Sequence, residues 1–209
     1  MTPDLSYEET AWAEAHGIVA GVDEVGRGPL AGPVTAAAVV LDRANIPEGL
    51  NDSKKLSQAK REALAEAIHT SAQVAIIHVS VEEIDALNIL RASHLAMERA
   101  LAQLPALPGM ALIDGNRMPV ELPCAGRTIV KGDGKSLSIA AASIVAKVAR
   151  DRLMVDLAQQ HPGYGWETNA GYPTAVHKKA LRDLGVTPHH RRSFAPVRNI
   201  LYQGNSTSL

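Results

Sequence analysis

The residues Ile18-Val19-Ala20-Gly21-Val22-Asp23-Glu24 form an apolar run that ends in two adjacent acids, and Gly26-Arg27-Gly28-Pro29 follows almost at once. The apolar run is typical of a buried strand, and the glycines and the proline favour a turn. Carboxylates at the end of a buried strand are unfavourable unless a cation meets them. The simplest such cation is a divalent metal ion, so we expect the rest of the chain to be organised around a metal site here.

Further strands and helices are expected on both sides of a sheet. The run at residues 33–41 is the natural hairpin partner of the first strand, which we place at 19–24. The later strands are expected at residues 73–79, 110–113 and 127–131. The helices are expected at 57–69, from 88 to just before Pro105, at 137–159 and at 174–184. This order predicts one α/β domain with a small C-terminal helical appendage.

The composition is that of an ordinary globular chain. Of the 209 residues, 46% are hydrophobic and 21% charged, and no apolar run approaches the length of a membrane span. The first residues are acidic where a secretory signal would be basic and then apolar. The lone cysteine, Cys124, has no partner for an internal disulfide. We therefore expect a cytoplasmic protein without membrane association.

The two halves of the sequence carry opposite charge. Residues 1–126 hold 9 Lys and Arg against 17 Asp and Glu, whereas residues 127–209 hold 12 against 5. A polyanion would find its attractive surface in the second half. The alternative is that the charges mix on the folded surface.

Three acids are expected at strand ends. Asp23 and Glu24 end the first strand, and Asp114 ends the strand at 110–113, where ligands gather in open α/β sheets. An all-oxygen ligand set selects hard ions such as Mg²⁺ or Mn²⁺. Because successive strand residues point to opposite faces, we expect a twist or bulge before Gly26 that lets both adjacent acids face one ion.

A fourth candidate acid, Asp151, lies within the helix at 137–159. The spacing of Ile144, Val148, Asp151 and Val155 places it on an apolar, sheet-facing stripe. A carboxylate that faces inward needs a partner, and a metal ion would be one. The alternative is a structural ion pair with Lys147 or with Arg150.

Other short motifs do not support a site. Gly26-Arg27-Gly28 is not a dinucleotide fingerprint, because Ala31 stands where its third glycine would be. His189-His190 has neither a helical partner nor a cysteine pair, so we expect solvated basic surface there.

The string from Gly21 to Val34, GVDEVGRGPLAGPV, resembles the signature of bacterial ribonuclease HII, the type 2 ribonuclease H family. The resemblance covers most of residues 18–199 in the order of the family. It continues through Asp52-Ser53-Lys54-Lys55-Leu56, Ile113-Asp114-Gly115, Lys131-Gly132-Asp133, residues 141–147, Ala149-Arg150-Asp151-Arg152 and Gly171-Tyr172-Pro173-Thr174.

The resemblance implies a ribonuclease H-like fold, a five-stranded mixed sheet flanked by helices. Residues 1–209 would form a single domain, with a catalytic core at about 17–160, a C-terminal helical extension at about 161–200 and a polar tail at 203–209. We expect a monomer, and no protein partner is evident from the sequence.

The resemblance also implies roles for individual residues. The turn of Gly26, Arg27 and Gly28 would read a ribose 2′-hydroxyl through its main chain, and Tyr172 would stack on the deoxyribose that follows. Lys54 and Lys135 would contact phosphates. The four acids that would be catalytic and bind metal are Asp23, Glu24, Asp114 and Asp151.

The implied activity is endonucleolytic hydrolysis of the RNA strand of RNA–DNA hybrids, and incision 5′ of a single ribonucleotide in duplex DNA. Two ions, Mg²⁺ or Mn²⁺, would act in the substrate-bound site and leave 3′-OH and 5′-phosphate ends. One alternative is type 3 ribonuclease H, although Tyr172 favours type 2. The other is a catalytically silent module that only binds nucleic acid.

Overall fold

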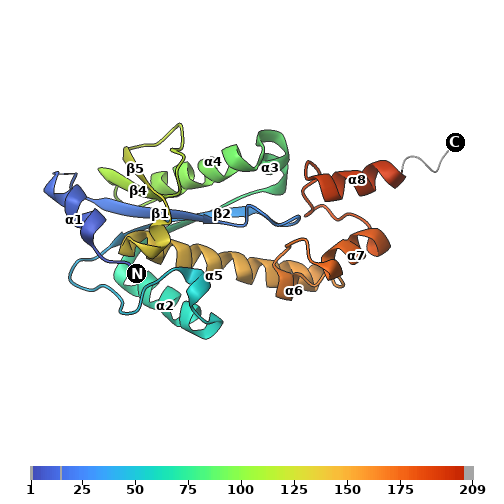
Figure 1. Cartoon of the computed structure of the whole chain (residues 1–209), viewed down its shortest axis with the longest axis horizontal. Helices are drawn as coiled ribbons and strands as arrows, with labels where there is room; N and C mark the ends of the chain where they lie inside the picture. The colour runs from blue at the N-terminus through green and yellow to red at the C-terminus, as the bar shows by residue number, and fades with distance from the viewer. Residues whose placement is uncertain (1, 15, 205–209) are drawn as a thin grey trace.

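The computed structural model describes residues 2–14 and 16–204, and within them a five-stranded mixed sheet forms the centre (Figure 1). The strand order is β3-β2-β1-β4-β5, with β1 antiparallel to β2, β2 antiparallel to β3, and β1, β4 and β5 parallel. The predicted mixed sheet is therefore confirmed. The strands are β1 (Val19–Val25), β2 (Val34–Leu41), β3 (Ala72–Val79), β4 (Met110–Asp114) and β5 (Ala125–Ile129).

Helices cover both faces of the sheet, and a group of short helices extends beyond one end of it (Figure 1). One face carries α3 and α4, and the other carries α2 and the long α5, while α6 to α8 form the C-terminal group. The bounds are α1 (Ser6–Ala13), η1 (Ser53–Lys55), α2 (Gln58–Ser71), α3 (Val81–Leu87), α4 (Ile89–Ala102), η2 (Gly132–Gly134), α5 (Leu137–Gln160), α6 (Trp166–Asn169), α7 (Ala175–Leu184) and α8 (Ala195–Gly204). None of these helices has both the length and the apolar character needed to cross a membrane.

Small residues let α5 lie directly on the sheet. A Cβ atom at Gly21 would come within 2.1 Å of the backbone of Ser138, so no other residue fits at this point of β1. The two faces of β2 separate as strand alternation requires: Ala36 and Ala38 pack towards α4, and Ala37 and Val39 towards α5. The close approach fixes the height of α5 over the end of β1.

The structure differs from the expectations in two respects. The fifth strand ends at Ile129 rather than at residue 131, because Lys131 adopts a left-handed conformation, with φ of 56°, and leads into η2. The short α6 and the terminal α8 were not expected. Most of the polar tail predicted at 203–209 lies outside the described residues.

The sequence analysis expected solvated surface at both His189 and His190. This is wrong for His190, which is fully buried. The N–H of Thr187 donates to Nδ1 of His190 at 3.0 Å, so the proton of the neutral ring is on Nε2. That Nε2 lies 3.0 Å from Nε2 of His177, whose Nδ1 lies 2.9 Å from the carbonyl oxygen of Tyr172. The hydrogen bonds thus run in one direction, from Thr187 to Tyr172, through two neutral rings.

Burial, followed by the nearby charges of His177 and His189, lowers the pKa of His190 to about 3. The folded protein accepts His190 only as a neutral ring, so the contribution of this residue to stability is complete above its unfolded pKa of about 6.5. That contribution is lost as the pH falls from about 6.5 towards 3, because the unfolded chain then binds a proton that the folded protein does not.

We predict that the free energy of unfolding of the wild-type protein depends more steeply on pH, between 6 and 4, than that of His190→Asn. The difference in slope is expected to be about 1.4 kcal/mol per pH unit, the value for one proton. Urea denaturation at several pH values measures it. The exposed His69 gives the control, since His69→Asn is expected to leave the slope unchanged, and equal slopes for His190→Asn and the wild type would contradict the prediction.

Candidate active site

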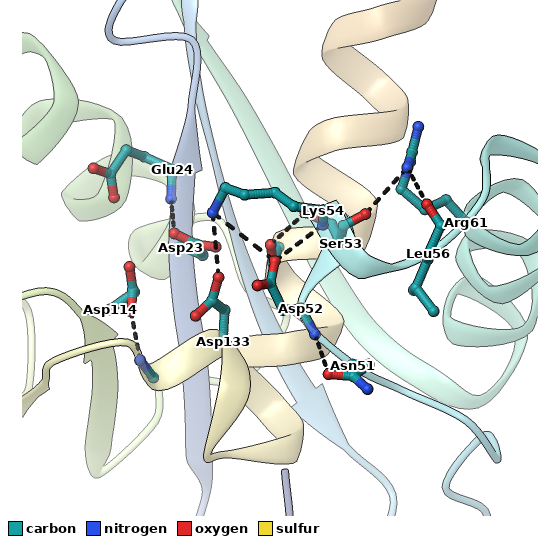
Figure 2. Close-up of polar contacts among 12 residues, drawn as sticks. Asp23, Glu24, Asn51, Asp52, Ser53, Lys54, Leu56, Arg61, Asp114 and Asp133 are labelled. Carbon is teal, nitrogen blue, oxygen red and sulfur yellow. Dashed lines mark hydrogen bonds and ion pairs between the residues drawn. The ribbon is translucent and has the colours of Figure 1, made fainter. Parts of the chain in front are cut away.

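Four carboxylates meet where β1 and β4 stop pairing. The parallel register of these strands runs from Val19↔Met110 to Val22↔Ile113, so Asp23 and Asp114 are the next residues on each strand. Figure 2 shows Asp23, Glu24 and Asp114 around this point, together with Asp133 of η2. The structure therefore brings together three of the four predicted acids and adds one that was not predicted.

The two adjacent acids reach this point without the expected bulge. The pairing of β1 with β2 continues one residue at a time, through Asp23↔Ala37 and Glu24↔Ala36, to the end of the strand. Asp23 faces α5, where Ser143 donates to it, and Glu24 lines a pocket with Ser93 and other residues of α4. The expectation of an irregular strand is wrong because the acids use opposite faces of β1 and meet beyond its last pair with β4.

Asp114 links the end of β4 to the turn that carries Asp133. Its Oδ1 accepts a hydrogen bond from the N–H of Gly132 at 2.6 Å (Figure 2). A Cβ atom at position 132 would lie 2.6 Å from the side chain of Ile139, so a glycine lets η2 approach the core. The bond holds Asp114 and Asp133 at one edge of the sheet.

Asp133 is the residue that the sequence analysis missed. It is only 7% exposed, lies 3.4 Å from Nζ of Lys54 through Oδ2, and acts electrostatically on both Asp23 and Asp114. The available signal was its place in Lys131-Gly132-Asp133, a segment already matched to the family, directly after the last strand. A buried acid after the final strand of a parallel pair is a candidate ligand for the same reason as Asp114.

Burial and mutual repulsion make the ionised form of these carboxyl groups unfavourable. Burial, then the charges of Glu24 and Asp114, raise the pKa of Asp23 well above its ordinary value. Burial also raises the pKa of Glu24, against the opposing effect of Arg27, and the pKa of Asp114. Removing these carboxylates from water and placing them side by side is unfavourable, and a multivalent cation would relieve both effects.

Two side chains supply positive charge at the cluster. Nη1 of Arg27 lies 3.1 Å from Oε1 of Glu24, and Lys54 lies near Asp133 and, at 3.9 Å, Asp52. Both cations are largely exposed, so they compensate the buried acids only in part. Within the described residues, no group of three or more acid, histidine or cysteine side chains is placed so that it could hold a metal ion as it stands. The donor set, carboxylate oxygens alone, nevertheless fits Mg²⁺ or Mn²⁺.

The structure does not bring Asp151 into this cluster. Its Oδ1 lies 2.6 Å from Nζ of Lys147, and it lines a separate pocket between α2 and α5. The stripe used to place it leaves the core, since Val155 is 39% exposed. The buried stripe of this half of α5 is instead Ala146, Arg150, Met154 and Ala158. The convergence predicted for Asp151 is therefore wrong, and the alternative of an ion pair with Lys147 is what the structure shows.

The predicted sugar-reading turn lies beside the acids. Gly26 has a φ of +90°, and a Cβ atom there would come within 2.1 Å of Nε of Arg150, so only glycine fits. Arg27 and Gly28 are exposed. A Cβ atom at Gly28 would lie 3.3 Å from the ring of Tyr172, which is itself 44% exposed. The turn and the tyrosine thus form one continuous exposed surface.

Lys54 and Lys135 line one hollow on the other side of the acids. Two more lysines, Lys55 and Lys131, and two acids, Asp52 and Asp133, complete its charged lining. Although burial lowers it, the pKa of Lys54 is raised overall by Asp133, Asp52 and Asp23. A lysine-rich hollow next to an acidic cluster suits a polyanion that carries its phosphates past bound cations.

Comparison with known proteins gives consistent matches. The sequence model of the family described as Ribonuclease HII matches residues 20–197. A Ribonuclease HII of Ruegeria pomeroyi is 68% identical over 201 residues, which cover 96% of this chain and 86% of that protein.

Solved structures share the fold. A ribonuclease H2 from Pyrococcus horikoshii OT3 superimposes with a TM-score of 0.76 at 29% identity, covering 90% of this chain and 99% of that one. A structure titled Bst-RNase HIII in complex with Mn²⁺ gives a TM-score of 0.72 at 21% identity, covering 97% of this chain and 82% of that one, and supports the fold alone.

We predict that Asp23→Asn raises the melting temperature of the metal-free protein at pH 7. The wild-type pKa is higher in the folded state, so the charged carboxylate opposes folding at pH 7, and a neutral amide removes that opposition. An effect of about 1 kcal/mol corresponds to roughly 2–4 °C in a protein of this size.

Differential scanning calorimetry measures the shift, with Asp156→Asn, on the exposed side of α5, as the control. Added Mg²⁺ is expected to raise the melting temperature of the wild type more than that of Asp23→Asn. A lower melting temperature for Asp23→Asn than for the wild type without metal would contradict the electrostatic account.

Proposed function

The chain belongs to the ribonuclease HII family, and from this premise we propose that it cleaves the RNA strand of RNA–DNA hybrids and incises duplex DNA on the 5′ side of a single embedded ribonucleotide. The chain is a metal-dependent endonuclease of the ribonuclease H type. The observation that supports the proposed substrates is the exposed Gly28–Tyr172 surface next to the buried carboxylates. The expected products carry 3′-OH and 5′-phosphate ends.

We propose that Asp23, Glu24, Asp114 and Asp133 hold the metal, Mg²⁺ or Mn²⁺. With substrate bound, two ions would supply an activated water and stabilisation of the departing 3′ oxygen. The protein residues do the positioning: Asp23 and Glu24 approach from opposite faces of β1, and the N–H of Gly132 orients Asp114. Burial and the neighbouring acids raise the pKa values of Asp23 and Asp114, and a bound cation would offset both effects.

Substrate selection is assigned to main-chain groups and one ring. The N–H groups of Arg27 and Gly28 would meet the ribose 2′-hydroxyl, and Tyr172 would stack on the next deoxyribose. Lys54 and Lys135 would contact phosphates from the lysine-lined hollow. We further propose that residues 1–209 act as one domain, as a monomer in the cytoplasm.

The two alternatives are less well supported. A type 3 enzyme would share the fold, but the family match and the relative at 68% identity are both ribonuclease HII. A silent binding module would not need buried acids that raise one another's pKa. Incubating the protein with a duplex that contains one ribonucleotide, with and without Mg²⁺ or Mn²⁺, tests the activity, and a wild-type protein inactive with both ions would refute it.

We predict that Asp133→Asn lowers kcat by roughly 100-fold or more, the scale of losing one electrostatic contribution to a transition state. Asp114→Asn is expected to behave likewise and to keep most of the affinity for the duplex.

The matched acid is Asp151, whose side chain is paired with Lys147. Asp151→Asn is expected to stay within about twofold of the wild type, as for a surface substitution. Single-turnover cleavage of a duplex with one ribonucleotide gives these rates. The reverse order, with Asp151 essential and Asp133 dispensable, would restore the assignment made from the sequence.

We predict that Lys135→Gln raises KM and leaves kcat unchanged, because a phosphate contact contributes to binding before and during reaction alike. The slope of log KM against log salt should fall by about 0.7–0.9, the contribution of one phosphate contact. Lys60→Gln on α2, outside the hollow, is the matched control. An unchanged salt slope in Lys135→Gln would remove this residue from the substrate surface.

A further inference from the structure

Arg150 and Arg191 are both 0% exposed, and the ion pairs of the described part of the chain include neither of them. Each guanidinium hydrogen-bonds instead to backbone carbonyls. Arg191 donates to the carbonyls of Gly26 at 2.6 Å, Arg27 at 3.0 Å and Gly32 at 2.8 and 3.0 Å. Arg150 donates to those of Ala31 at 3.1 Å, Pro33 at 3.0 Å and Ala170 at 3.0 Å.

Both groups carry their charge at neutral pH. Burial lowers the pKa of Arg150 to about 10, and burial together with the charge of Arg150 lowers that of Arg191 to about 9. Two buried cations side by side are an unfavourable way to fill a core, and apolar residues of similar size are often as stable or more so. What a guanidinium offers instead is a rigid planar set of donors that fixes several acceptors at once.

The carbonyls bound by Arg191 determine where the turn directs its N–H groups. In a trans peptide the C=O and the next N–H point in opposite directions. Holding the carbonyls of Gly26 and Arg27 inward therefore turns the N–H groups of Arg27 and Gly28 outward. Consistent with this, no hydrogen bond within the described residues uses either N–H. These are the two donors that the proposed function directs at a ribose.

Arg150 connects this turn to the segment that carries the tyrosine. It joins the carbonyls of Ala31 and Pro33 to that of Ala170, two residues before Tyr172. The N–H of Leu30 donates to the carbonyl of Gly171 at 2.8 Å in the same place. The two guanidinium groups thus fix the distance from the outward N–H groups to the ring of Tyr172.

We infer that Arg150 and Arg191 are positioning residues that set the spacing between the Arg27–Gly28 donors and Tyr172, and so the enzyme's preference for a ribonucleotide followed by a deoxyribonucleotide. Neither arginine touches the substrate. The inference rests on the proposed function, because that function supplies the ribose and deoxyribose that the two elements contact.

The test uses binding rather than cleavage, in the full chain with Asp114→Asn as the parent. Fluorescence anisotropy gives the affinities for a duplex with one ribonucleotide and for the same duplex made of DNA alone. The parent is expected to prefer the ribonucleotide. Adding Arg191→Lys or Arg150→Lys, which keep the charge but lose the fork, is expected to reduce that preference about tenfold or to abolish it, with little change in affinity for DNA alone.

The control is Arg91→Lys, whose guanidinium donates to the carboxylate of the buried Glu98 on α4 rather than to the backbone carbonyls of the turn. It is expected to keep the preference of the parent. If the parent shows no preference for the ribonucleotide duplex, the proposed function fails. If the parent shows this preference and both lysine variants keep it, with circular dichroism spectra of folded proteins, this inference fails.

A second measurement requires no folded arginine variant. The Nη–H groups of Arg191 donate to the carbonyls of Gly26 and Arg27, and their resonances in the Asp114→Asn protein are expected to shift more with the ribonucleotide duplex than with the all-DNA duplex. The reason is that a hydrogen bond at a peptide N–H polarises the carbonyl of the same peptide. Equal shifts with the two duplexes would overturn the inference even if both lysine variants fail to fold.

Discussion

Repulsion among carboxylates at the end of β1 and β4 is the constraint around which this structure is built. Folding moves Asp23 into a site that is 5% exposed and places other acids beside it, and the hydrophobic contacts of the sheet with α4 and α5 have to outweigh that opposition. Arg27 and Lys54 offset the charge only from the solvent side. The architecture is therefore most favourable when a cation is bound, which ties the stability of the fold to its chemistry.

Much of the fold could be predicted from the sequence because the pattern and the packing agree. The hairpin of residues 33–41 with the first strand and the helix expected at 57–69 both appear in the structure, as the β1–β2 pair and α2. The end of β5 was predicted two residues too late because Lys131 adopts a left-handed conformation, which a lysine in the sequence does not indicate. The failure at α5 has a different cause: the apolar periodicity chose Val155, whereas the buried stripe contains a charged residue, Arg150.

The site was predictable in part for the same reasons. Three acids could be placed because strand ends are visible in the sequence, but the face to which each strand residue points depends on the register with β2. Asp133 lies in a one-turn helix that no periodicity marks, and only its hydrogen-bonded neighbour Gly132 fixes it next to Asp114. The sequence does not predict the contacts of Arg150 and Arg191, because the partners of both side chains are backbone carbonyl groups.

The strand order also determines which part of the sheet can form first during synthesis. Strands β1, β2 and β3 are consecutive in the chain and can pair as soon as residue 79 is available, whereas β4 begins at Met110 and η2 ends at Gly134. Asp23 and Glu24 are thus translated long before the acids that oppose them. The N-terminal meander can form with only the mutual repulsion of Asp23 and Glu24, and the further repulsion from Asp114 and Asp133 is added late in translation.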